Sequence, residues 1–101
     1  MKTNNILNKL SKLSKLNKLN KLRKIKIGGL VYNIEYTELE ESLGRTEYSK
    51  QLIQIDNRQT KEQQEVTLIH EIIHCLNNQR SELETEALAQ SLYQIIKDNN
   101  F

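Results

Sequence analysis

The segment His70-Glu71-Ile72-Ile73-His74 constrains this chain more than any other, because it holds both of the histidines in the sequence. Residues four apart on an α-helix lie on the same face, so the two imidazoles can bind one metal ion. The glutamate between them is then placed to act on a water molecule bound to that ion. The spacing therefore predicts a helix over this segment, with a metal site on one side of it.

Length and cysteine content limit the rest of the fold. A chain of 101 residues is expected to form one small domain with little apolar core to spare. Its one cysteine, Cys75, cannot form an intrachain disulfide, which fits the reducing cytosol and leaves a metal ion as the available cross-link. No stretch has the apolar length of a transmembrane helix, and the N-terminal leucines never run together as in a secretory signal. We therefore expect a soluble protein of the cytoplasm.

Charge divides the chain into two parts. Residues 1–27 hold nine Lys or Arg and no acid, whereas residues 28–101 hold six basic and thirteen acidic residues, so +9 lies beside −7. Between residues 9 and 22 a Lys-Leu-(Ser/Asn) triplet repeats. Three residues advance a helix by about 300°, so the leucines build no fixed apolar face. We expect residues 1–22 to be a disordered, low-complexity basic arm. The alternatives are nucleic-acid or anionic-surface binding through residues 1–27 and a mitochondrial-type targeting arm, although lysine stands in place of the usual arginine.

Three strands are expected after this arm, in a folded domain at residues 23–101. Residues 24–27 alternate polar and apolar side chains, Gly28-Gly29 marks a turn, and residues 30–36 are rich in β-branched and aromatic side chains. This pattern predicts a hairpin. A third strand is expected at residues 51–56. Residues 37–49 are polar and acidic around a glycine, and we interpret them as a connection.

Two helices are expected to follow. Thr60 is the predicted cap of a helix from about Lys61 to Leu76, with the Gln63 side chain reaching back to the cap. The buried stripe of this helix is expected to leave both histidines on its flank. Ser81 and Glu84 have the spacing of a capping box that starts a second helix. Because the link is short, we expect the two helices to lie antiparallel.

The third metal ligand is expected to come from the second helix. A tetrahedral catalytic zinc takes three protein ligands and a water, and the sequence has no third histidine. Cys75 points about 100° away from His74 around the helix, so an acid is needed. Glu84 is expected in the capping box, which leaves Glu82 and Glu86, one turn apart on a shared face. Reflecting the antiparallel helices about their turn would set Glu86 level with the histidines, so both remain candidates.

These residues resemble a known family. Glu82-x-x-x-Glu86 after His-Glu-x-x-His resembles the Glu-x-x-x-Asp arrangement of gluzincin peptidases. More closely, the segments from Thr67 to His74 and from Glu82 to Ala89 are similar to the small ImmA/IrrE-type metallopeptidases of phages, prophages and conjugative elements. The hairpin, the third strand and the C-terminal segment from Leu92 to Asn99 fit the same pattern. The resemblance covers residues 23–101 and leaves the basic arm outside it.

The resemblance implies an α+β fold of the minimal zincin kind, with a three-stranded sheet packed on the His-Glu-x-x-His helix and a C-terminal helix. It makes His70, His74 and Glu82 the ligands of a zinc ion. It makes Glu71 the general base that takes a proton from a zinc-bound water. Glu86, in the place of the family's aspartate, becomes the carboxylate that hydrogen-bonds a zinc-bound histidine, and it is also the alternative third ligand.

The implied function is that of a zinc-dependent peptidase hydrolysing a peptide bond in a protein partner, such as a phage repressor-type regulator in the host cytoplasm. An exposed edge strand, expected at Leu52 to Asp56, would hold the extended substrate by β-augmentation. Tyr48, Arg80 and Tyr93 are candidates for stabilising the oxyanion. The alternatives are a zinc-stabilised binding or regulatory module without turnover, and a nucleic-acid-associated protein acting through residues 1–27.

Overall fold

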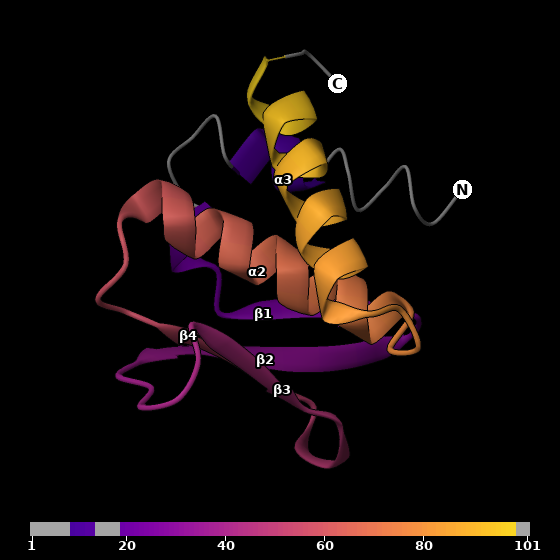
Figure 1. Cartoon of the computed structure of the whole chain (residues 1–101). Helices are drawn as coiled ribbons and strands as arrows, with labels where there is room; N and C mark the ends of the chain where they lie inside the picture. The colour runs from indigo at the N-terminus through magenta and orange to yellow at the C-terminus, as the bar shows by residue number, and fades with distance from the viewer. Residues whose placement is uncertain (1–8, 14–18, 99–101) are drawn as a thin grey trace.

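The chain folds into an α+β domain in which one long helix lies against one face of a mixed sheet and a second long helix crosses over the first (Figure 1). A computed structural model describes residues 9–13 and 19–98. The four strands lie in the order β1-β2-β4-β3. The elements, besides a short helix at residues 9–13, are η1 (Leu19–Lys21), β1 (Lys24–Ile27), β2 (Leu30–Thr37), β3 (Gly44–Glu47), η2 (Tyr48–Lys50), β4 (Leu52–Asp56), α2 (Lys61–Leu76) and α3 (Glu82–Asp98).

The predicted hairpin is present as β1 and β2, which pair antiparallel with Ile27 opposite Leu30. The two residues between them, Gly28 and Gly29, have φ values of 58° and 87°. Glycine adopts this left-handed region without the steric cost that a Cβ imposes, and two-residue turns of this kind match the twist of the strands. The turn thereby fixes the register that sends Ile25 into the core and Lys26 to solvent.

The prediction of three strands is wrong, because the segment interpreted as a connection contains β3. This strand pairs antiparallel with β4, and β4 pairs in parallel with β2 on its other side. The expected edge strand at Leu52–Asp56 is therefore internal, and β3 forms that edge of the sheet. The sequence Gly-Arg-Thr-Glu has little of the β-branched and aromatic content that predicts strands, so its pairing is set by tertiary contacts.

Helix α2 has the predicted bounds, Lys61–Leu76. The Thr60 side chain accepts a hydrogen bond from the Gln63 amide at 3.1 Å, which confirms the cap. The Gln63 side chain does not reach back, and instead donates to the Thr67 hydroxyl at 3.5 Å. The expected stripe of Val66, Ile69, Ile72 and Ile73 is buried, whereas Leu76 at its end is half exposed.

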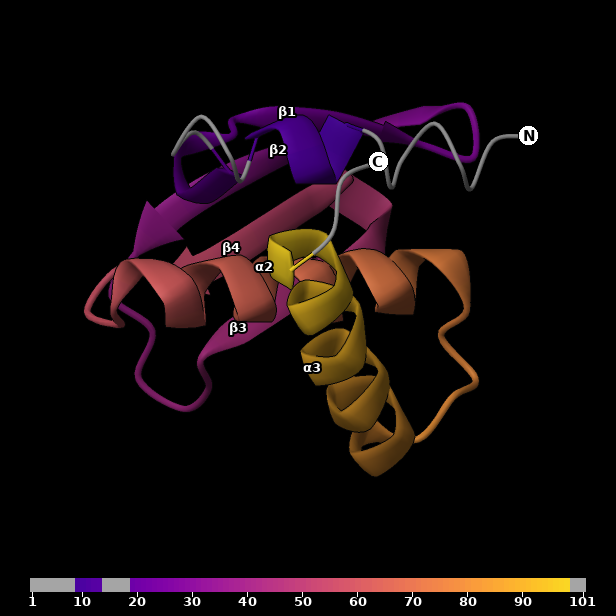
Figure 2. The same cartoon turned by 90° about the horizontal axis from the view of Figure 1, so that it is seen from above.

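Helix α3 starts at the predicted cap, where Ser81 Oγ accepts from the Glu84 amide at 3.1 Å and donates to the Glu84 carboxylate at 3.0 Å. The expected antiparallel arrangement is wrong, since α3 crosses α2 steeply (Figure 2). The small side chains of Thr85 and Ala89 are fully buried on α3, which allows a close crossing. No helix within the described residues is both long and apolar enough to cross a membrane.

Part of the basic arm belongs to the core, which differs from the expectation of a disordered arm. Residues 9–13 form a short helix and η1 packs on α2. Leu10 and Leu19 are buried in the same cluster as the sheet and α2. The triplet repeat gives no apolar face to one continuous helix, but separate short turns can each direct a leucine inward. The rest of the arm, residues 1–8 and 14–18, lies outside the described residues.

Candidate metal centre

His70, His74 and Glu82 form a compact group whose ligand atoms all lie within 4.8 Å of one another. The Nε2 atoms of the two histidines are 3.1 Å apart. One carboxylate oxygen of Glu82 is 2.6 Å from His74 Nε2, and the other is 3.2 Å from His70 Nε2. The histidines come from adjacent turns of α2 and the glutamate from the first turn of α3. Such a group can hold a metal ion.

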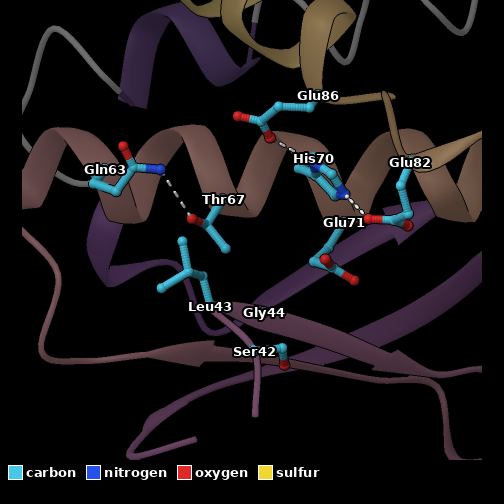
Figure 3. A pocket seen from close by; sticks show the side chains of 9 residues that line it. All are labelled: Ser42, Leu43, Gly44, Gln63, Thr67, His70, Glu71, Glu82 and Glu86. Carbon is cyan, nitrogen blue, oxygen red and sulfur yellow. Dashed lines mark hydrogen bonds and ion pairs between the residues drawn. The ribbon is translucent and has the colours of Figure 1, made fainter. Parts of the chain in front are cut away.

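Glu86 contacts the other nitrogen of the His70 ring, with its Oε1 atom 2.8 Å from Nδ1 (Figure 3). A carboxylate in this place favours a proton on Nδ1 and leaves the Nε2 lone pair free for a metal. Gln90 donates to the second oxygen of Glu86 at 2.9 Å. That hydrogen bond, helped by His70, lowers the pKa of Glu86. The structure thus brings Glu82, and not Glu86, into the ligand group.

The helix crossing accounts for this division of roles. Antiparallel helices would have set Glu86 level with the histidines, but the steep crossing brings only the first turn of α3 against their Nε2 atoms. The two histidine side chains are nearly buried, at 12% and 13% exposed, whereas the Glu82 side chain is 79% exposed. Two ligand positions are therefore held by packing, and the third is held mainly by contact with the other two.

Glu71 is buried and hydrogen-bonded on the same helix. The Thr46 hydroxyl of β3 donates to Glu71 Oε1 at 2.7 Å. Burial raises the pKa of the Glu71 carboxyl, and the hydrogen bond from Thr46 opposes that rise. A carboxylate with a raised pKa is a stronger proton acceptor, which suits a general base.

Gly44 of β3 lies directly against this carboxylate. A Cβ at this position would be 2.6 Å from Thr67 Cγ2 and 3.3 Å from Glu71 Oε2, so no other residue fits without movement of α2 or the strand. Sequence reasoning missed both Gly44 and Thr46 as parts of the site. The available signal was an isolated glycine in a polar segment, which often marks the close approach of another element.

A pocket of about 250 Å³ extends from the metal group along α2 toward its N-terminal half (Figure 3). This volume is slightly below the usual range for small-molecule sites, which is about 300–1,000 Å³. Glu71 points from α2 toward the strand side of this space. Its lining comes from the loop before β3, from β3, from α2 and from α3, namely Ser42, Leu43, Gly44, Gln63, Thr67, His70, Glu71, Glu82 and Glu86.

Of the three candidates for oxyanion stabilisation, Tyr48 contacts the main chain of one of the histidines. Its hydroxyl donates to the His74 carbonyl at 3.4 Å. The Tyr93 hydroxyl instead donates to Glu65 at 2.7 Å and does not line the pocket beside the metal group. Arg80 lies in the loop that connects α2 to α3, with its guanidinium 4.0 Å from Glu84. Neither Tyr93 nor Arg80 is brought into the group.

Cys75 packs against the core and is not a member of the ligand group. Burial raises the pKa of its thiol to about 11. Because the thiolate is the form that binds metals and attacks carbonyl groups, a thiol that stays protonated is suited to neither task. This agrees with the expectation that Cys75 points away from the histidines.

No protein-family model, no curated protein and no solved structure matches this chain. The resemblance to ImmA/IrrE-type metallopeptidases therefore stays a prediction that rests on the sequence. The ligand group rests separately on the distances between His70, His74 and Glu82.

Proposed function

We propose that this chain is a zinc-dependent metallopeptidase that hydrolyses a peptide bond in a protein partner. One observation carries the proposal. The buried carboxylate of Glu71 lies beside a group of two histidines and one glutamate, and it lines the same pocket as His70 and Glu82 of that group. A metal-binding module without turnover needs the ligands but has no use for a buried, oriented carboxylate next to them.

The donor set fits zinc. Two imidazole nitrogens and one carboxylate oxygen are the protein ligands of many catalytic zinc sites, which keep a fourth position open. The carboxylate of Glu86 on the far nitrogen of His70 is a common partner of metal-binding histidines. When bound, zinc polarises a carbonyl oxygen and lowers the pKa of a water ligand.

The remaining chemistry belongs to Glu71. Thr46 occupies its Oε1 atom, and Oε2 has no hydrogen-bond donor among the described residues. The free oxygen faces the gap beside Gly44, on the pocket side. Glu71 takes the proton of the attacking water through this oxygen and then passes it to the leaving amine. The carboxylate is held in place throughout by the Thr46 hydroxyl.

The outer edge of β3 is the expected place for the substrate. The Asp56 amide donates to the Leu43 carbonyl at 2.8 Å, and the register pairs Arg45 with Gln54. In an antiparallel ladder, every second residue of a strand directs its main-chain N–H and C=O groups to the partner strand. Leu43 and Arg45 direct theirs to β4, so the main-chain groups of Gly44 and Thr46 point to the outer edge. An extended peptide added there by β-augmentation lies alongside Glu71. The substrate strand thus binds to β3 and not to Leu52–Asp56.

Metal content and hydrolysis test the proposal together. Elemental mass spectrometry should find one zinc per chain, and this zinc should be lost in His74→Ala. Zinc-loaded protein should cleave unstructured casein peptides, with products identified by mass spectrometry. Glu71→Gln should keep the zinc and lose at least a hundredfold in rate.

Two results contradict the proposal in different ways. A metal-free protein whose melting temperature does not change with added zinc excludes a metal centre. A zinc-bound protein with no activity above that of Glu71→Gln on any peptide supports the alternative of a zinc-stabilised binding module.

A further inference from the structure

The positive charges of this chain are concentrated before its first acidic residue, Glu35, and nine Lys or Arg precede it. Five lysines of this segment belong to the described residues, and all five are exposed. None of them has a carboxylate oxygen within 4.0 Å among the described residues. These lysines are Lys9, Lys12, Lys21, Lys24 and Lys26.

The other cations of the described residues behave differently. Five of the seven side chains form ion pairs, namely Arg45 and Lys50 with Glu47, Arg58 with Asp56, Arg80 with Glu84, and Lys97 with Glu65. The exceptions are Lys61 and Arg23, whose guanidinium lies over the Tyr36 ring. Positive potential is therefore largely neutralised in the second part of the chain. It stays unneutralised around the N-terminal segment, where a polyanion would meet it.

The five lysines lie on three elements at the β1 side of the sheet, namely the helix at residues 9–13, η1 and β1 itself. Strand β1 is an edge strand, with Lys24 and Lys26 on its solvent side and its isoleucines in the core. The helix at residues 9–13 lies over β1 in both views, and Lys21 ends the η1 turn just before the strand (Figures 1 and 2). This edge is opposite β3, so it lies across the sheet from the metal group.

The leucines of the same segment favour a water-soluble partner and not a lipid surface. An amphipathic segment binds a membrane by burying its apolar side chains in the lipid. Here Leu10 and Leu19 are buried in the core, and Leu13 and Leu22 pack partly buried against it. The Lys-Leu repeat therefore has its described leucines turned inward and its lysines turned outward.

We propose that this lysine edge, formed by Lys9, Lys12, Lys21, Lys24 and Lys26, binds the phosphate backbone of nucleic acid without sequence preference. Exposed lysines that lack acidic partners are the usual source of such binding, because they replace the counterions of the phosphates. The edge has few groups suited to reading bases, which accounts for the lack of sequence preference. The binding needs neither the metal ion nor Glu71.

Fluorescence anisotropy with a 20-base-pair DNA duplex and the full chain tests this proposal. The variant Lys24→Gln/Lys26→Gln removes two charges from the edge, and Lys50→Gln/Lys61→Gln removes two elsewhere as the matched control. At 50 mM salt we expect affinity to fall at least tenfold in the first variant and less than twofold in the control. The slope of log K against log salt should become shallower by up to about 1.8 in the first variant. Chelator and Glu71→Gln should leave binding unchanged.

Three results would overturn the proposal. The first is no binding of the duplex by the wild type at 50 mM salt. The second is an equal loss of affinity in the control variant. The third is tighter binding to vesicles of phosphatidylserine and phosphatidylcholine than to the duplex. If Lys24→Gln/Lys26→Gln melts at a lower temperature than the wild type, Lys12→Gln/Lys21→Gln replaces it with the same expected loss.

Discussion

The Thr46 hydroxyl lies 2.7 Å from Glu71 Oε1 and thereby joins the edge strand β3 to α2, the helix that carries the histidines. Gly44, two residues earlier on the same strand, has no side chain to keep the strand away from that carboxylate. One four-residue strand therefore sets the position of the proposed base. The same strand offers the free edge to which the proposed substrate binds. Its two tasks link substrate docking to the orientation of Glu71.

Thr46→Val is expected to remove the hydrogen bond with little change in shape. A hydrogen bond to a charged group contributes about 1.5–3 kcal/mol, so a base left without it should lose roughly ten- to a hundredfold in rate. Thr46→Ser keeps the hydroxyl and should retain most of the activity. Both rates are measured on zinc-loaded protein, whose zinc content should equal that of the wild type. Full activity in Thr46→Val, or a loss confined to Thr46→Ser, would show that the methyl group, and not the hydroxyl, is needed.

Gly44→Ala is expected to destabilise the fold, because its Cβ would lie 2.6 Å from Thr67 Cγ2. Overpacking of this kind costs about 1–3 kcal/mol in the free energy of unfolding, measured with urea. Thr67→Ser removes the opposing methyl group and keeps the hydroxyl that donates to Gln59 at 2.8 Å. The double variant should therefore be more stable than Gly44→Ala alone. A double variant as unstable as Gly44→Ala would mean that the contact with Glu71 dominates.

Asp56 is expected to make stability depend on acid pH. The Arg58 side chain donates to both carboxylate oxygens, at 3.0 and 2.8 Å, and its amide adds a bond at 3.1 Å. These bonds lower the pKa of Asp56. A carboxyl with a lowered pKa in the folded state stabilises the fold above its unfolded pKa, and this contribution is lost as pH falls through the folded pKa.

Urea unfolding between pH 2 and pH 7 measures this contribution. Asp56→Asn should lower the free energy of unfolding at pH 7 and flatten its fall in acid. Arg58→Gln removes the guanidinium that pairs with Asp56 and should flatten the fall of the free energy of unfolding in acid as well. An acid limb of unchanged slope in both variants would assign the pH dependence to other carboxyl groups.

The sequence predicted the parts of this fold that local chemistry determines. Gly28-Gly29 marks a turn because only glycine adopts both left-handed conformations without strain. Thr60 and Ser81 mark helix starts because their side chains satisfy free amide groups. The two histidines were brought together by helical spacing alone. Each of these signals lies within a few residues of the feature that it predicts.

The missed features depend on contacts between distant segments. Strand β3 has weak intrinsic preference and exists through its pairing with β4 and its contacts with Glu71. The crossing of α2 and α3 depends on the buried faces of both helices, and it decided between Glu82 and Glu86. The inward leucines Leu10 and Leu19 depend on a surface that other elements create. A short-range pattern contains none of this information.

The two glutamates of α3 are expected to affect zinc binding unequally. Glu82→Ala removes a carboxylate that contacts both Nε2 atoms, and it should abolish the rise in melting temperature that zinc causes. Glu86→Ala removes only the partner of His70 Nδ1, which typically weakens metal affinity about ten- to a hundredfold. A zinc titration followed by thermal unfolding measures both, with Glu84→Ala as the control from the same helical turn. The reverse order of effects would make Glu86 the ligand, and would require α3 to shift along α2 when the ion binds.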